Sequence, residues 1–334
     1  MIRTSSTRRA VALALVAMLA LGLLTGCSAK TVETAKPAAP AAKPIAIKIG
    51  TLATEDSLPL WVAEKMGYFS TQGIPAVEIV NFQSAQERDV AFASGAIDAF
   101  MGDMIASANL EASGKKNSIE TIMLGADQSQ GRFAVVVPPK STVTDMKSLA
   151  GVPVGTSSAT IQEYVLDGLM SEAGVATESV KTEEVKKVPV RFELLMAGKL
   201  KAAALPEPFV TLAEQGGAKI VGDDTKAKSN WSQTVLVFSD EYLAKTGGTE
   251  TKDAVLDAWD LAVNDINKTP DAYRELLVEK ARLPKPLATT YKVNVYPTHQ
   301  LPTVERVDAI LGWMTAKGYL KGGVTAADLL PATE

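Results

Sequence analysis

The sequence contains one cysteine, Cys27, and one histidine, His299. A single cysteine excludes a disulfide within the chain. One residue of each kind also excludes a Cys/His metal site within one chain. Long runs of one charge sign are missing, and the formal net charge is only −4. Binding to nucleic acid requires a basic stripe that neutralises phosphates, so we expect no nucleic-acid partner.

Three motifs that mark common enzyme classes are absent as well. The sequence has no G-x-G-x-x-G for dinucleotides, no P-loop for nucleoside triphosphates and no G-x-S-x-G nucleophile elbow. These absences predict a protein that is not an enzyme and that uses neither a cofactor nor a metal.

The chain contains enough hydrophobic residues to form the cores of two domains. It has 334 residues, of which 46% are hydrophobic and 22% are charged, as in an ordinary globular protein. A single hydrophobic core rarely grows beyond about 250–300 residues, so we expect two domains.

The first residues have the pattern of an export signal. Three arginines lie within the first nine residues, an apolar run covers Ala10–Leu24, and Thr25-Gly26-Cys27 follows. The apolar run is shorter than the ~20 residues of a membrane-spanning helix. This segment resembles a bacterial lipoprotein signal peptide over residues 1–27, which implies cleavage before Cys27 and a lipid on that cysteine. We expect a protein anchored by lipid in the cell envelope, on the extracytoplasmic face of a membrane; an uncleaved anchor helix is the alternative.

The remaining chain divides into a tether and two lobes. Residues 28–44 are rich in Ala, Lys, Pro and Thr and have no apolar pattern, which is typical of a flexible tether. We expect lobe one over residues 45–136, lobe two over 137–235, and a return to lobe one over 236–330.

An internal repeat supports two similar lobes. Ile49-Gly50-Thr51 is echoed by Val154-Gly155-Thr156, and Ser94–Ala99 is echoed by Ala197–Ala202. Gly155 follows Gly50 by 105 residues, and Gly198 follows Gly95 by 103. The nearly constant offset indicates two lobes with the same order of elements, each with a polar loop after its first strand.

Strands and helices alternate along both halves. Short β-branched runs end in polar residues that start helices, an order typical of a parallel sheet flanked by helices. Two further β runs, 132–137 and 231–238, are predicted to cross between the lobes. The predicted fold class is therefore α/β with two lobes, each a mostly parallel sheet flanked by helices.

Four phrases carry a resemblance to a known family: the lipobox at Cys27, Leu58–Phe69, Ser94–Ala99 and Leu205–Phe209. With the order of elements, they are similar to the substrate-binding lipoproteins of nitrate/sulfonate/taurine-type ABC importers. That superfamily also includes thiamine-pyrimidine-precursor-binding proteins and synthases. The resemblance extends over residues 45–320. It implies the two-lobed periplasmic-binding-protein fold of type II, with a small solute held between the lobes and delivered to a membrane permease.

Candidate ligand-binding residues follow from the position of the loops. Ligands of open α/β sheets gather where strands end and helices begin. Applied to both lobes, this rule selects hydroxyl, amide and charged side chains, to which we add one aromatic residue that could stack on a ring. The set is Thr54, Ser57, Gln83, Ser84, Asp103, Gln130, Arg132, Thr156, Ser157, Ser158, Thr160, Glu207 and Trp231.

Plainer roles remain open for most of this set. The hydroxyl and carboxyl residues can simply cap helices, and Thr160 with Glu163 has the form of a capping box. Arg132 can form a salt bridge instead of holding an anion. The aromatic residues that could stack on a ligand can equally fill helix cores; they are Trp61, Phe82, Tyr164 and Trp231. His299 is expected to be solvated.

The charge balance near the predicted cleft bears on the solute. The acidic residues there outnumber Arg132; they are Glu55, Asp56, Asp103, Asp127 and Glu207. This balance disfavours a bare inorganic anion and favours a solute with amino or amide donors, such as a taurine-like zwitterion or an aminopyrimidine.

We therefore expect a monomeric receptor that passes a sulfonate/taurine-like or pyrimidine-like solute to an ABC permease. Two other functions stay open. One is a pyrimidine-precursor synthase on the same fold. The resemblance implies that such an enzyme uses a catalytic cysteine and histidine, and here the only cysteine is the predicted lipidation site, which disfavours this function. The other is a surface sensor that binds the same kind of solute.

Overall fold

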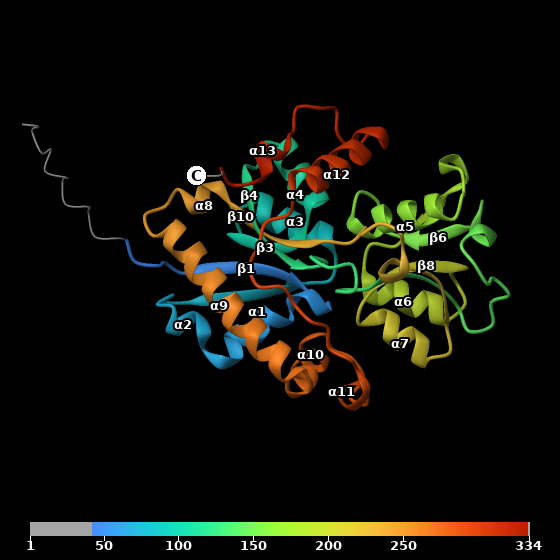
Figure 1. Ribbon diagram of the computed structural model, residues 1–334, viewed down its shortest axis with the longest axis horizontal. Helices are drawn as coiled ribbons and strands as arrows, with labels where there is room; N and C mark the ends of the chain where they lie inside the picture. Colours follow the sequence, from blue (N-terminus) through green and yellow to red (C-terminus); the bar gives the residue numbers. More distant parts are fainter. Residues whose placement is uncertain (1–41, 333–334) are drawn as a thin grey trace, which may run out of the picture. The chain divides into compact units, whose positions relative to one another are not determined.

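The computed structural model describes residues 42–332, and Figure 1 shows their arrangement. The predicted signal peptide, the lipidated Cys27 and residues 28–41 of the predicted tether lie outside the described residues. Among residues 42–332, no helix combines the length and the apolar character needed to cross a membrane.

Lobe one is built on a five-stranded sheet in the order β2-β1-β3-β10-β4. Its strands are β1 (Ile47–Leu52), β2 (Val77–Phe82), β3 (Ala99–Asp103), β4 (Asn117–Leu124) and β10 (Thr234–Ser239). Its helices are α1 (Leu58–Met66), α2 (Tyr68–Thr71), α3 (Ala85–Ala93), α4 (Met104–Ala112), α8 (Asp240–Leu243), α9 (Gly248–Lys268), α10 (Arg274–Lys280), α11 (Leu287–Thr290), α12 (Val304–Ala316) and α13 (Ala326–Leu329).

Lobe two repeats the plan with the sheet order β7-β6-β8-β5-β9. Its strands are β5 (Phe133–Val137), β6 (Pro153–Thr156), β7 (Lys181–Glu184), β8 (Ala202–Pro206) and β9 (Lys219–Asp223). Its helices are α5 (Ile161–Glu172), α6 (Val188–Met196) and α7 (Phe209–Gln215).

The expected two-lobed α/β fold is confirmed, and each sheet is mixed, with one strand that opposes the direction of the other four. Four strands of each sheet run in one direction, and the crossing strand, β10 in lobe one and β5 in lobe two, runs against them and pairs antiparallel on both of its edges. The sheet changes before Phe133, whereas the expected lobe boundary falls after residue 136. The second crossing strand begins at Thr234, so Trp231 lies ahead of it.

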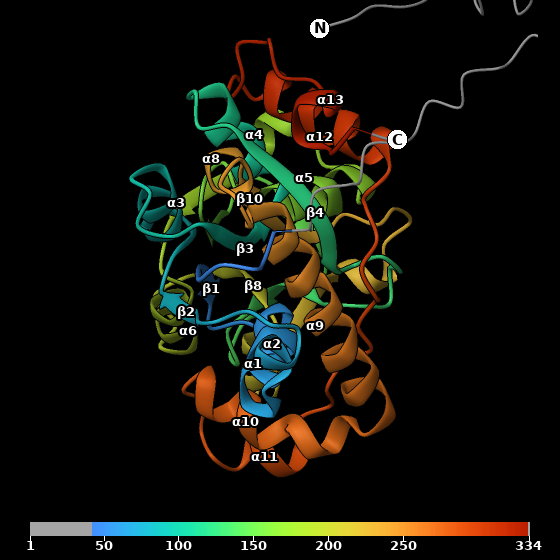
Figure 2. The same ribbon diagram turned by 90° about the vertical axis from the view of Figure 1, so that its left-hand side faces the viewer.

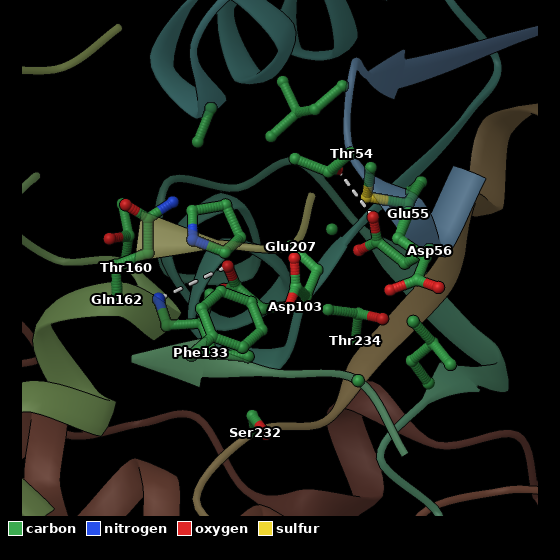
Figure 3. A pocket seen from close by; sticks show the side chains of 18 of the residues that line it. Thr54, Glu55, Asp56, Asp103, Phe133, Thr160, Gln162, Glu207, Ser232 and Thr234 are labelled. Carbon is green, nitrogen blue, oxygen red and sulfur yellow. Dashed lines mark hydrogen bonds between the residues drawn. The ribbon is translucent and has the colours of Figure 1, made fainter. Parts of the chain in front are cut away.

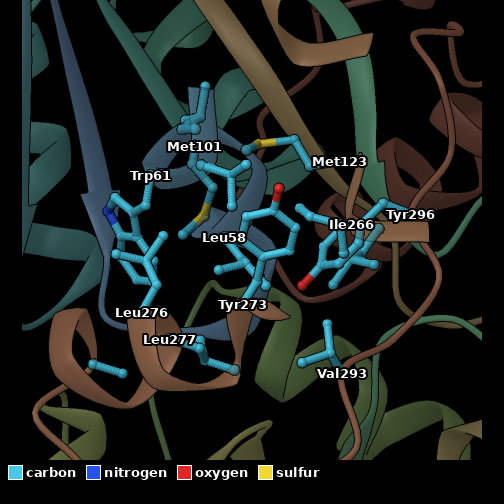
Figure 4. Close-up of a cluster of buried hydrophobic side chains, with 14 of the residues drawn as sticks. Leu58, Trp61, Met101, Met123, Ile266, Tyr273, Leu276, Leu277, Val293 and Tyr296 are labelled. Atoms are coloured by element: carbon cyan, nitrogen blue, oxygen red, sulfur yellow. The ribbon is translucent and has the colours of Figure 1, made fainter. Parts of the chain in front are cut away.

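Alternate residues of β10 explain how lobe one buries both faces of its sheet. Leu236 and Phe238 pack into the cluster that contains α1 and α9, whereas Val235 and Val237 pack into the cluster beneath α4 and α12. Figure 2 shows α9 beside α1, and α12 and α13 beside α4. In Figure 4, the first cluster gathers Leu58, Trp61 and the α10 leucines.

The internal repeat has a steric cause. A Cβ added to Gly50 in β1 would meet Cδ1 of Ile97 at 2.4 Å, and one added to Gly155 in β6 would meet Cδ1 of Leu200 at 2.7 Å. In each lobe, then, the strand that carries the glycine (β1 or β6) leaves room for one aliphatic side chain from just before its parallel neighbour (β3 or β8). Because the glycine of one strand must make room for the aliphatic residue near the other, the Gly-Thr phrase and the Gly-x-Ile/Leu phrase recur together in both lobes.

Gly125 provides a direct test of close packing between the two crossing segments. It has φ +85°, and an added Cβ would lie 1.8 Å from the carbonyl oxygen of Ser232. We expect Gly125→Ala to lower the free energy of unfolding by about 3 kcal/mol or more, because it adds a backbone clash to left-handed strain.

The matched control is Gly114→Ala. Gly114 has φ +83° but nothing within 4 Å of the added Cβ, so it isolates the conformational cost of about 1 kcal/mol. Denaturant unfolding of the two variants measures the difference in their free energies of unfolding. Equal losses would show that the backbone at Ser232 moves away from the added methyl group at little cost.

Candidate functional site

A cavity of about 40 Å³ lies between the lobes, where the first strands end and the next helices begin. Of the predicted set, the following residues line it: Thr54, Asp103, Arg132, Thr160 and Glu207. Figure 3 shows Thr160 and Gln162 from α5 on one side and Thr54 and Asp56 from lobe one on the other. The repeated loops of both lobes therefore meet at one cavity.

Four buried carboxyl groups border the cavity: Glu55, Asp56, Asp103 and Glu207. Glu55 accepts hydrogen bonds from the Tyr291 hydroxyl at 2.7 Å and from the backbone and side chain of Asn294 at 2.9 and 3.0 Å. Burial, followed by the nearby charge of Glu207, raises the pKa of Glu55 to about 8. Burial at this site therefore makes the Glu55 carboxyl harder to ionise than it would be in water.

The other three acids show the same trend. Burial raises the pKa of Asp56, which accepts a 2.6 Å hydrogen bond from Thr54. Burial also raises the pKa of Asp103, against the opposing charge of Arg88. It raises the pKa of Glu207 too, although the backbone and hydroxyl of Thr211 donate to that carboxyl.

Two arginines border the cavity, and both are held by other partners. Arg88 donates to Asp89 and, at 2.8 Å, to the Met101 carbonyl, and its guanidinium lies 4.8 Å from the Phe100 ring centre. Arg132 donates to Asp223 at 2.9 Å and to Glu214 at 2.9 Å, with Glu207 at 3.5 Å. The salt-bridge role considered for Arg132 is the one that the structure shows.

Several predicted residues lie away from the cavity. Ser57 donates to the Leu52 carbonyl within its own loop, and Ser84 caps α3 by accepting from the amide of Glu87. Ser158 bonds to Glu184, Gln130 accepts from the amide of Asp127, and the hydroxyl of Thr156 is buried without a partner in the described structure. Trp231 donates to Glu172 and packs edge-on against Tyr164.

The predicted capping box at α5 is wrong. The Thr160 hydroxyl donates to the carbonyl of Ser157 instead of accepting from the first helical turn. Glu163 accepts from the amide of Ala159 and also from Tyr319, which approaches from lobe one. A long-range partner therefore takes the carboxyl that the local motif requires.

None of the aromatic residues considered for stacking lines the 40 Å³ cavity. Trp61 is fully buried in the lobe-one core, and Tyr164 packs between Trp231 and Trp313. Phe82 borders an adjoining groove. His299 is half exposed and contacts Asp260 at 2.7 Å, far along the chain from the cavity residues.

Two predicted residues join the lobes instead of lining the cavity. Ser157 accepts a 2.8 Å hydrogen bond from Gln86 of α3, and Gln83 accepts one of 3.1 Å from Lys187 of lobe two. Asp103 both borders the cavity and joins the lobes, because it accepts a hydrogen bond from the amide of Ile161 at 3.4 Å. It also caps α4 by accepting from the amide of Ala106. These contacts hold the lobes in a closed arrangement.

Sequence reasoning missed other lining residues, among them Arg88, Phe133, Gln162, Ser232 and Thr234. Ser232 and Thr234 lie on the second crossing, whose role as a cavity wall follows from the two-lobed plan. The side chain of Arg88 is only 1% exposed, and nothing in the local pattern of α3 marks an arginine as buried. Among residues 42–332 there is no group of three or more His, Cys, Asp or Glu side chains that could hold a metal ion.

The sheets and the interlobe cavity define the class of fold: a type II periplasmic-binding-protein fold with a closed cleft. The chain belongs to the NMT1-like family, whose sequence model matches residues 40–278. No curated protein sequence matches the chain.

Solved structures show the same fold. The alkanesulfonate-binding protein SsuA from Xanthomonas axonopodis pv. citri, bound to MOPS, superposes with a TM-score of 0.72 at 16% identity, covering 87% of this chain and 100% of its own. SsuA from Escherichia coli, a periplasmic aliphatic sulphonate binding protein, gives 0.71 at 16% identity over 87% and 93%. The periplasmic nitrate-binding protein NrtA from Synechocystis PCC 6803 gives 0.68 at 12% over 85% and 84%.

Proposed function

We propose that this chain is an extracytoplasmic solute receptor, anchored by lipid at Cys27, that delivers a small polar organic solute to an ABC permease. The observation that carries the proposal is the enclosed cavity between two lobes, bordered by hydroxyl and carboxyl groups from both. A solute that bridges the two lobes favours the closed state by its differential affinity for it. The names of the structural neighbours, which are binding proteins for alkanesulfonate, aliphatic sulphonate and nitrate, support a solute-binding role.

The ligand set that we propose consists of the predicted residues that border the cavity, together with Asp56, Gln162 and Thr234. The solute would be sulfonate/taurine-like or pyrimidine-like, and the receptor would act as a monomer. Catalysis is not part of the proposal, because the only cysteine is the proposed lipidation site and His299 therefore has no cysteine nucleophile to act on.

A thermal-shift panel tests the receptor function. We expect one class among sulfonates, nitrate, bicarbonate, pyrimidines and flavin precursors to raise the melting temperature, since a solute at 100 times its Kd stabilises the folded state by about 2.7 kcal/mol. The same solute should reduce the radius of gyration in solution scattering if the free protein samples an open state. A panel in which no member stabilises the protein would contradict the proposal.

A further inference from the structure

The charges around the 40 Å³ cavity do not suit an anion. Four buried carboxyl groups border it, and the two arginines already donate to protein acceptors at 2.7 to 3.2 Å. An anionic solute group would therefore approach carboxylates without a free guanidinium to bind. A group that brings N–H donors and positive charge would instead find acceptors.

One cavity group lacks a partner. The hydroxyl of Thr234 is buried, with 4% of the residue exposed, and makes no hydrogen bond in the described structure. Thr234 is the first residue of β10 and borders the cavity. Its hydroxyl lies close enough to Asp56 to lower the pKa of that carboxyl, but the two groups do not align as a hydrogen bond. A buried polar atom left without a partner costs free energy, which a bound N–H donor would recover.

Size gives the second constraint. A water molecule needs roughly 10–15 Å³ of such volume, so 40 Å³ holds only a few small atoms. A groove of about 440 Å³ adjoins the cavity and shares Leu52 and Thr54 with it. Its walls come from both lobes and are mainly apolar: Phe82, Pro189, Phe192, Phe209, Leu212 and Leu283.

We propose that the solute has two parts: a compact head with positive charge and at least two N–H donors, held in the cavity by Asp56 and Thr234, and an apolar body held in the adjoining groove against Phe192. Amidines and amines with an aromatic or short alkyl body belong to this class. The inference rests on the proposed receptor function and narrows its solute class, since it disfavours sulfonates and nitrate.

Isosteric probes of opposite charge test the head. Acetamidine and phenylacetamidine match acetate and phenylacetate in shape, so calorimetry on the full chain separates charge from size. We expect both amidines to bind at least tenfold more tightly than their carboxylate counterparts. We also expect phenylacetamidine to bind at least tenfold more tightly than acetamidine, because its ring reaches the groove.

Two variants assign the parts. Asp56→Asn keeps an acceptor for the Thr54 hydroxyl but removes the charge, and should weaken both amidines about tenfold or more. Phe192→Ala should weaken phenylacetamidine by a similar factor and leave acetamidine unchanged. The control is Asp240→Asn, an exposed carboxyl at the start of α8 outside the cavity and the groove, which should change neither affinity by more than twofold.

The outcomes separate this inference from the receptor function. Carboxylates that bind more tightly than amidines, or a phenyl body without effect, would overturn the two-part solute. If the amidines do not bind but a sulfonate or another panel solute does, the inference is overturned and the receptor function stands. If no compound of either panel binds, both are overturned.

Discussion

Raising the pH from about 5 to about 8 is expected to lower the free energy of unfolding by on the order of 6 kcal/mol. Two buried carboxyl groups cause this. Burial and the charge of Glu207 raise the pKa of Glu55 to about 8. Burial raises the pKa of Asp224 to about 7; the charge of Asp223 raises it further, whereas hydrogen bonds from Ser232 and the Phe133 amide oppose the rise.

The sign follows from proton binding. In the unfolded chain both groups ionise near pH 4, so between that pH and the folded pKa the native state holds protons that the unfolded state has lost. The stabilisation is complete below the unfolded pKa and disappears as the pH rises through about 7 and about 8. Carboxyl groups whose pKa is lowered, such as Asp127 and Asp145, titrate below this window and do not offset the loss.

Asp224→Asn isolates one of the two titrations. The Asn side chain can still accept from the Phe133 amide, as Asp224 does at 2.9 Å, and can donate to the Ser232 hydroxyl. Urea unfolding between about pH 5 and 8 should give the variant a shallower pH dependence and, at pH 8, a greater stability than the parent. A parent protein that gains stability over this range would contradict the prediction.

The sequence predicts the plan of the fold because that plan depends on local patterns. Apolar periodicity marks most strands, and the Gly50 and Gly155 phrases mark equivalent places because each must accommodate an aliphatic side chain from its own lobe. The direction of the crossing strands could not be predicted in this way. It depends on pairing β10 between β3 and β4, which are more than 100 residues earlier in the chain.

The candidate site likewise contains residues that local sequence predicts and residues that depend on long-range packing. Four of the residues that border the cavity could be predicted, because the ends of strands and the starts of helices are recognisable from local sequence. They are Thr54, Asp103, Thr160 and Glu207. Ser57 and Ser84 satisfy the same rule, but their hydroxyls serve their own loops. Arg88 shows the converse: its role depends on reaching the Met101 carbonyl in a strand that lies 13 positions later. Sequence thus locates the loops, and packing decides which side chains face the cavity.

Lys317→Met is expected to shift the lobes toward an open arrangement. At the end of α12, Lys317 pairs with Glu163 at 2.8 Å and Asp167 at 3.0 Å, both on α5 of lobe two. Two aromatic donors of lobe one reinforce the contact: Trp313 donates to Asp167 at 2.9 Å and Tyr319 to Glu163 at 2.7 Å. These residues form the strongest charged connection between the lobes that the described residues show.

The size of the effect follows from burial. The side chain of Glu163 is 3% exposed, so removal of its cation leaves a buried carboxylate in the closed state that opening would hydrate. Breaking such a pair costs about 3–5 kcal/mol when fully buried, and because Lys317 itself is 24% exposed we expect about 2 kcal/mol, or roughly 30-fold in the open–closed equilibrium. Methionine keeps the apolar stem of the lysine against Trp313.

Lys252→Met is the matched control. Lys252 is 20% exposed and pairs with Glu120, which is 5% exposed, but both residues belong to lobe one. Both variants should lose comparable thermal stability, whereas only Lys317→Met should increase the radius of gyration in solution scattering. If the two variants scatter alike, the α12–α5 ion pairs do not hold the lobes closed, and the contacts of α3 with Ser157 and Lys187 must stabilise the closed state instead.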